Sequence, residues 1–83
     1  MYTYSDLIVA RGVSANTPAS EIDARAQLVM QDPSLSLRAK GLFTLLLEFA
    51  GEPHNPFAEL YEPAEVIHDA VEELVAAGLI IRV

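Results

Sequence analysis

The feature that most constrains this chain is an apolar helix in its middle. Ser36 is a typical N-cap residue, and Gly51 is a typical residue just beyond the end of a helix. On a helical projection, the apolar side chains between them wrap most of the circumference instead of forming one stripe, which predicts a central helix buried on most sides. They are Leu37, Leu42, Phe43, Leu45, Leu46, Leu47 and Phe49.

A second helix is predicted before the central one. Thr17 offers a capping hydroxyl and Pro18 suits the first helical position, so we expect the helix to begin there. Asp32-Pro33 disfavours continuation, which places the end of this helix near Gln31. Its apolar residues recur at helical spacing: Ile22, Ala26, Val29 and Met30.

The residues after the central helix predict a short helix, a longer helix and a strand. Asn55 can cap the short helix, which has a proline at its first position and runs to about Tyr61. Pro63 opens the longer helix and Gly78 ends it, while residues 79–83 form the β-strand. The inner face of the longer helix is expected to be Ile67, Ala70, Val71, Leu74 and Val75.

The first residues leave two structures open. Ser5 to Arg11 could form one or two helical turns, with Ser5 as the cap and Gly12 as the stop. A short strand fits the same stretch equally well, with Tyr2, Tyr4, Leu7, Ile8 and Val9 as its apolar residues.

Two stretches resemble a known family. Leu35 to Leu42 (LSLRAKGL) is similar to the LS-x-x-A-K-G-L opening of winged-helix domains in phage and plasmid replication and regulatory proteins. Ala70 to Ile80 (AVEELVAAGLI) looks like the end of a recognition helix entering the wing of such a domain. The resemblance implies a mainly α fold, a small winged-helix-like helix-turn-helix domain with a short β-strand or hairpin.

The resemblance also implies a division of the chain. Residues 34–83 would be the helix-turn-helix core of a single domain, and residues 1–33 an N-terminal extension with one helix. The stretch after Gly78 supplies one wing strand, and early residues such as Tyr2 to Tyr4 could supply its partner. Gly41 costs about 1 kcal/mol relative to alanine inside a helix, and it is expected to permit close contact between helices.

Charge is the largest departure from the family. The chain contains five Lys and Arg and twelve Asp and Glu, which gives a net charge of -7. A domain that binds DNA usually carries a basic surface instead. The family places DNA-facing side chains at positions that match Ala64, Glu65, His68, Asp69 and Glu72. We predict a partner-binding surface for a basic protein, although a solvated helix face explains the same pattern. Its residues are Glu62, Glu65, His68, Asp69, Glu72 and the aromatic Tyr61.

Arg38 and Lys40 lie beside the start of the central helix and are the candidates for contact with nucleic acid. Ordinary surface residues are the simpler interpretation, with Arg38 placed to pair with a nearby carboxylate. His68 is expected to be a surface imidazole. A single histidine with neighbouring carboxylates is a weak ligand set, so no metal site is predicted.

Several function classes find no support in the sequence. It contains no phosphate-binding glycine loop, no nucleophile elbow and no cluster of metal ligands, so we expect neither enzymatic activity nor a cofactor. The absence of cysteine excludes disulfides and thiolate sites. The apolar runs are shorter than the roughly 20 residues that span a bilayer, and a basic signal-peptide start is missing. We therefore expect a cytoplasmic protein without a membrane partner.

Two functions remain. The first is a small acidic regulatory or adaptor protein that acts by protein–protein interaction; a phage or mobile-element origin and inhibition of a nucleic-acid-binding partner would fit it. The alternative is a homodimeric DNA-binding regulator of transcription or replication that uses Arg38 and Lys40. A chain of 83 residues with 52% hydrophobic residues is expected to hide apolar surface in an oligomer, so a homodimer is predicted in both cases.

Overall fold

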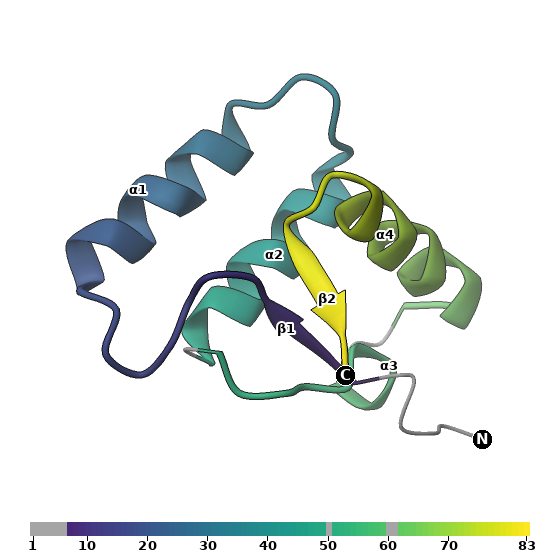
Figure 1. The fold of residues 1–83 in the computed structure, drawn as a ribbon. Helices are drawn as coiled ribbons and strands as arrows, with labels where there is room; N and C mark the ends of the chain where they lie inside the picture. The colour runs from purple at the N-terminus through teal and green to yellow at the C-terminus, as the bar shows by residue number, and fades with distance from the viewer. Residues whose placement is uncertain (1–6, 50, 60–61) are drawn as a thin grey trace.

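A computed structural model describes residues 7–49, 51–59 and 62–83 of the chain. The protein is mainly helical, as predicted, and contains a two-stranded antiparallel sheet (Figure 1). None of the helices in these three ranges has the length and apolar character needed to cross a membrane. In chain order the elements are β1 (Ile8–Ala10), α1 (Ala19–Met30), α2 (Leu37–Glu48), α3 (Pro56–Glu59), α4 (Ala64–Ala76) and β2 (Ile80–Arg82).

Helix α2 is the centre of the fold, as its apolar composition predicts. Helices α1 and α4 both pack against it, and β1 contacts it as well (Figure 1). The Ser36 hydroxyl caps α2 by accepting a hydrogen bond from the Ala39 amide at 3.1 Å. Gly51 follows the end of the helix with a φ of +88°, in the left-handed region that favours glycine. The buried residues of α2 are Ala39, Leu42, Phe43, Leu46 and Leu47.

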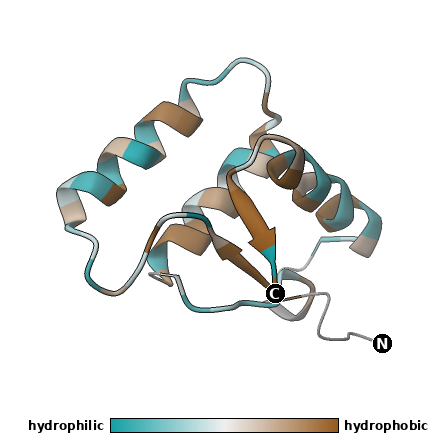
Figure 2. Cartoon of the chain, in the orientation of Figure 1, coloured by the Kyte–Doolittle hydropathy of each residue, from teal (hydrophilic) through white to brown (hydrophobic). Residues whose placement is uncertain are grey.

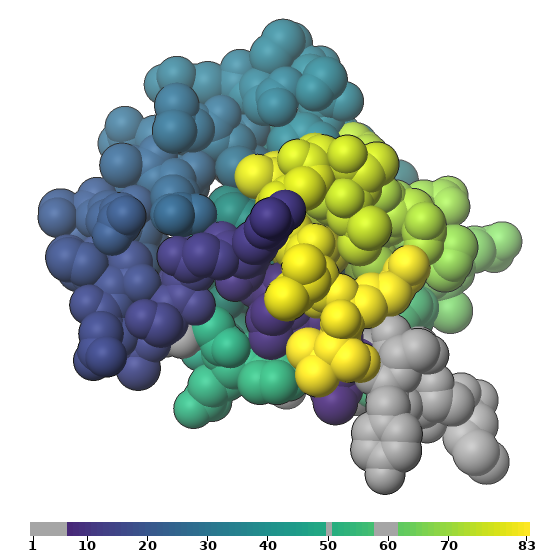
Figure 3. All heavy atoms as spheres, viewed as in Figure 1, coloured from purple at the N-terminus to yellow at the C-terminus, as the bar shows by residue number. Residues whose placement is uncertain are grey.

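The sheet joins segments that are far apart in the sequence. β1 pairs with β2 so that Ile8 lies opposite Arg82 and Ala10 opposite Ile80, and the two segments touch in the space-filling view (Figure 3). On its other side β1 meets His54, since the amides of Ile8 and His54 each donate to the other's carbonyl at 2.9 Å. A strand is thus present in the stretch for which the sequence allows two structures. The proposed strand at Tyr2 to Tyr4 lies outside the described residues.

A single hydrophobic cluster draws on both strands and on α1, α2 and α4. Figure 2 shows both strands largely in the brown of hydrophobic residues, whereas hydropathy varies along α1. From β1, α1 and β2 it includes Ile8, Ala10, Val29 and Ile80. The predicted inner face of α4 is confirmed, with Ile67, Ala70, Val71 and Leu74 buried and Val75 partly buried against the cluster.

Three local expectations were wrong. The Thr17 hydroxyl accepts a hydrogen bond from the Ser14 amide at 2.9 Å and so closes the preceding loop, and α1 begins at Ala19 instead. Leu37 belongs to the apolar set of α2 but is 80% exposed, because it is the first residue of the helix and lies outside the core. A Cβ atom added at Gly41 would meet nothing within 4 Å among the described residues, so this glycine permits no close contact inside the fold.

Candidate functional site

Helix α4 presents the predicted partner-binding residues to solvent. Burial of its inner face against the core turns the remaining positions outward. Glu62, which precedes the helix, and the helical residues Glu65, His68, Asp69 and Glu72 are all exposed. Tyr61, the aromatic member of the predicted surface, lies outside the described residues. The described part of the predicted surface is therefore acidic apart from His68.

An apolar groove of about 370 Å³ lies between α2 and α4. It is called the α2–α4 groove here, and its apolar lining comes from both helices. Two charged side chains complete the lining: Arg38 from the first turn of α2, and Glu62 from the residues just before α4. The lining consists of Arg38, Gly41, Leu42, Leu45, Glu62, Val66, Ile67 and Ala70.

A smaller recess of about 200 Å³ extends this groove along α4. The recess shares Arg38, Val66 and Ala70 with the groove, and Asp69 lines its wall. The side chain of Asp69 is 87% exposed. Glu62 therefore borders the apolar groove and Asp69 borders the partly polar recess that adjoins it, and both residues are exposed.

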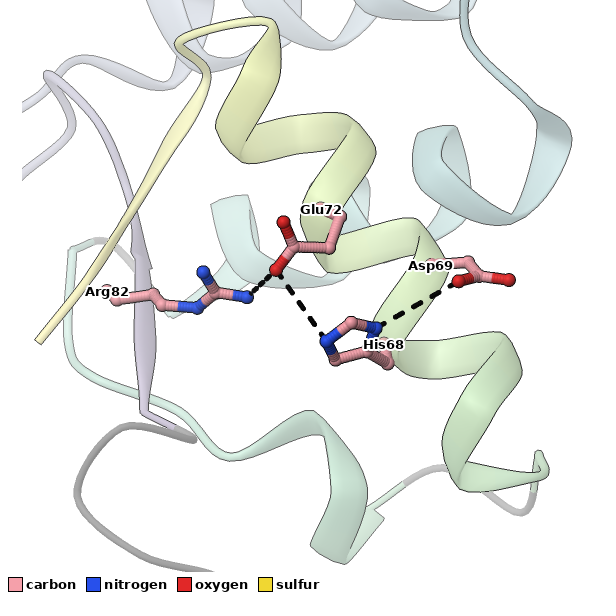
Figure 4. A network of polar contacts seen from close by, with 4 residues as sticks. All are labelled: His68, Asp69, Glu72 and Arg82. Atoms are coloured by element: carbon pink, nitrogen blue, oxygen red, sulfur yellow. Dashed lines mark hydrogen bonds and ion pairs between the residues drawn. The ribbon is translucent and has the colours of Figure 1, made fainter.

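A polar cluster occupies the side of α4 that faces β2 (Figure 4). Arg82 of β2 donates a hydrogen bond to the Glu72 carboxylate. His68 lies 3.7 Å from the same carboxylate through Nε2 and 3.9 Å from Asp69 through Nδ1. The hydrogen bond from Arg82, aided by the positive charges of Arg82 and His68, lowers the pKa of Glu72 below its ordinary value of 4.5. Glu72 thus already has a basic partner within the chain.

Glu73 has a structural role that sequence reasoning missed. The Ser36 amide donates to its Oε1 atom at 2.6 Å, and the Ser36 hydroxyl donates to its Oε2 atom at 2.8 Å. This carboxylate therefore fastens α4 to the beginning of α2, at the end of the α2–α4 groove. The two residues are 37 positions apart, and no local pattern indicates that they meet.

The five basic residues all lie within the described ranges, and the structure does not gather them into one patch. Arg38 lines the α2–α4 groove, whereas Lys40 is half-buried and acts electrostatically on the Asp32 carboxylate. Residues two apart point to different sides of a helix, so Arg38 and Lys40 lie on different sides of α2. At a different corner of the fold, Arg25 donates to the backbone carbonyl of Arg11 at 3.1 Å.

His54 is a buried histidine. Its exposure is 9%, and its ring stacks on Phe49 with the ring centroids 4.0 Å apart. The backbone of His54 pairs with Ile8 at the edge of the sheet, which accounts for its burial. Within the described part of the chain, no group of three or more His, Cys, Asp or Glu side chains could hold a metal ion.

No protein-family model, characterised protein or solved structure matches this chain. What the protein does must therefore be argued from its own charges, grooves and contacts.

Proposed function

We propose that this protein is a small acidic binding module that docks an amphipathic, basic segment of another protein in the α2–α4 groove. The observation that carries the proposal is an apolar groove bordered by the exposed carboxylates of Glu62 and Asp69. Such a groove takes up the apolar face of a helical segment, while the carboxylates attract lysine and arginine side chains along its edge. Regulation would follow from occupation of a basic surface that the partner otherwise uses for nucleic acid.

The order of elements supports a winged-helix-like core as the frame of this site. Helices α2, α3 and α4 are followed by β2, which corresponds to the first wing strand of the resemblance. β1, from the other end of the described chain, supplies the pairing strand. In this proposal α4 takes the place of a recognition helix but offers carboxylates where a DNA reader needs donors and cations.

Charge favours a protein partner over DNA. The chain has a net charge of -7, and Arg82 is engaged with Glu72. Lys40 interacts electrostatically with Asp32. Arg38 is the one basic residue that lines the α2–α4 groove. Phosphate neutralisation by several lysines and arginines supplies most of the affinity for DNA, and this surface does not provide it.

The proposal can be tested with a designed helical peptide that carries leucines on one face and lysines on the other. In an NMR titration we expect shifts at the amides of Leu45, Val66 and Ala70. A peptide of the same composition in scrambled order should bind at least about tenfold more weakly, since it has no apolar face. The double variant Glu62→Lys/Asp69→Lys should lose binding.

The matched control is Glu21→Lys/Asp23→Lys, which changes the net charge equally on α1, away from the groove. It should retain most of the affinity. Equal binding of the ordered and scrambled peptides, or equal loss in both double variants, would reduce the interaction to unspecific charge attraction and contradict the proposal. Tight, steeply salt-dependent binding of duplex DNA would support the DNA-binding alternative instead.

A further inference from the structure

A second groove, of about 510 Å³, lies between α1 and α2. It is called the α1–α2 groove here, and it differs from the α2–α4 groove in that none of its lining residues carries a charge. Leu37 projects from it into solvent, and Met30 is 51% exposed. Large apolar side chains exposed together mark a surface that another molecule covers. The lining is Ala26, Gln27, Met30, Gln31, Leu37, Gly41 and Thr44.

Gly41 lies at the middle of this exposed face of α2. Leu37, Gly41 and Thr44 follow helical spacing, so they form one stripe along the helix. A glycine inside a helix costs about 1 kcal/mol relative to alanine. Its open surroundings show that no packing within the described part of the chain offsets that cost. Removal of the side chain does allow the backbone of another helix to approach closely.

We propose that a second copy of this chain covers the α1–α2 groove. The two copies form a two-fold symmetric dimer in which α2 packs antiparallel on its counterpart at Gly41. Leu37 of each copy then reaches the α1–α2 groove of the other near Thr44. The apolar stripe and the bare glycine are thereby buried together. Gly41 also lines the α2–α4 groove, so the dimer interface adjoins the surface proposed for a basic partner at this residue.

Charge decides between a second copy and a different partner. In a two-fold interface each surface meets itself, so any net charge on it meets its own sign. The outer face of α4 carries Glu65 and Asp69, and self-association through it would set acids against acids in a chain of net charge -7. The α1–α2 groove avoids this repulsion because its lining is uncharged. A basic partner, by contrast, would gain nothing from an uncharged lining.

The ends of α2 are complementary in the same arrangement. Glu48 is exposed at the C-terminal end of α2, on the face that also carries Leu37 and Gly41. Antiparallel packing brings Glu48 near the N-terminal end of the other α2, whose dipole is positive there. Arg38 lies in the first turn of that end and is exposed, on the side of α2 that lines the α2–α4 groove. Each copy thus supplies an acid and a base, and the pair occurs twice.

Sedimentation equilibrium over a wide concentration range tests the proposal. We expect the wild-type chain to pass from monomer to dimer, and Leu37→Lys to raise the dissociation constant of the dimer about tenfold or more. The matched control is Leu28→Lys. Leu28 is 71% exposed on α1 but does not line the groove, so this variant should dimerise like the wild type. Far-UV circular dichroism confirms that the variants, altered only at exposed positions, remain folded.

A charge reversal gives the second readout. Glu48→Arg and Arg38→Glu should each weaken the dimer, and the double variant should restore it, because the reversed pair is again complementary. A wild-type chain that stays monomeric at every concentration would assign the groove to a different protein and overturn the proposal. Equal effects of Leu37→Lys and Leu28→Lys, or none from either, would overturn it too. Leu37→Lys should still bind the leucine–lysine peptide, so failure of this proposal is distinguishable from failure of the proposed function.

Discussion

Asp69, Glu72 and Glu73 are close neighbours in the sequence, yet their surroundings differ. Asp69 projects into solvent beside the α2–α4 groove, Glu72 is bound by Arg82, and Glu73 is hydrogen-bonded to Ser36. An acidic run on α4 is visible in the sequence, and its exposure follows from helical spacing. The different roles of these three acids cannot be read from the sequence, because the partners of Glu72 and Glu73 lie on other segments of the chain.

The pairing of Glu72 with Arg82 predicts a change in titration. Replacement of Arg82 by Gln should raise the pKa of Glu72 toward its ordinary value of 4.5, because the largest cause of the lowered pKa is the hydrogen bond from that guanidinium. A carboxyl with a lowered pKa stabilises the fold at pH above its ordinary value, and this contribution fades as the pH falls through the lowered pKa. In Arg82→Gln this pH-dependent contribution should largely disappear, because the pKa of Glu72 in the folded state then approaches that of the unfolded chain.

A carbon-13 NMR titration of the Glu72 carboxyl measures this change. Asp32 provides the internal control, because hydrogen bonds from the Ser34 hydroxyl and amide lower its pKa, and Arg82 plays no part in them. Asp32 should titrate alike in both proteins. An unchanged Glu72 pKa in the variant would show that Arg82 is not its partner in solution.

At the scale of elements, sequence patterns predicted the helix boundaries where a capping residue or a glycine at the helix end determines them. Ser36 caps α2, and Gly78 follows α4 with a φ of +74°, both as expected. The pattern failed at Thr17, whose hydroxyl accepts a hydrogen bond from the Ser14 amide of the preceding loop and does not cap α1. The α2–α4 groove could not be predicted, since it exists only where two separate helices meet.

Two glycines should respond oppositely to the same substitution. Gly51→Ala should lower the free energy of unfolding by at least about 2 kcal/mol, because its positive φ disfavours a side chain and the new Cβ would overlap the Val13 carbonyl oxygen. Gly41→Ala should raise it by about 1 kcal/mol, because the site is helical and open. Urea denaturation at concentrations low enough to keep the chain monomeric measures both. A loss of stability in Gly41→Ala would contradict the open surroundings of that site.

At the scale of the whole molecule, α2 separates two unlike surfaces. One side carries an apolar groove lined by Arg38 and Glu62 and the other a groove without charged lining residues. If both proposals hold, one chain uses the uncharged side to form a dimer and the acidic side to bind a basic segment, so each dimer offers two binding grooves. Sequence reasoning predicted both a dimer and a basic partner, but the two grooves to which we assign them arise only from the packing of α1 and α4 on α2.

β1 links distant parts of the chain by pairing with β2 and with His54. Ile8 is almost fully buried, pairs with Arg82 on one side and exchanges backbone hydrogen bonds with His54 on the other. The sequence could not decide between helix and strand for this stretch, because its hydrogen-bonding partners lie far away along the chain. The strand forms through tertiary pairing, so its burial is expected to stabilise the entire fold rather than one local segment.

Ile8→Ala should therefore lower the free energy of unfolding by about 2–4 kcal/mol, the usual cost of truncating a buried isoleucine. Val9→Ala, on the opposite and half-buried face of β1, should cost clearly less. Urea denaturation followed by circular dichroism gives both values. Similar losses for the two variants would mean that β1 contributes through backbone pairing alone. A larger loss for Ile8→Ala would instead show that the apolar face of the strand joins the two ends of the described chain to the core around α2.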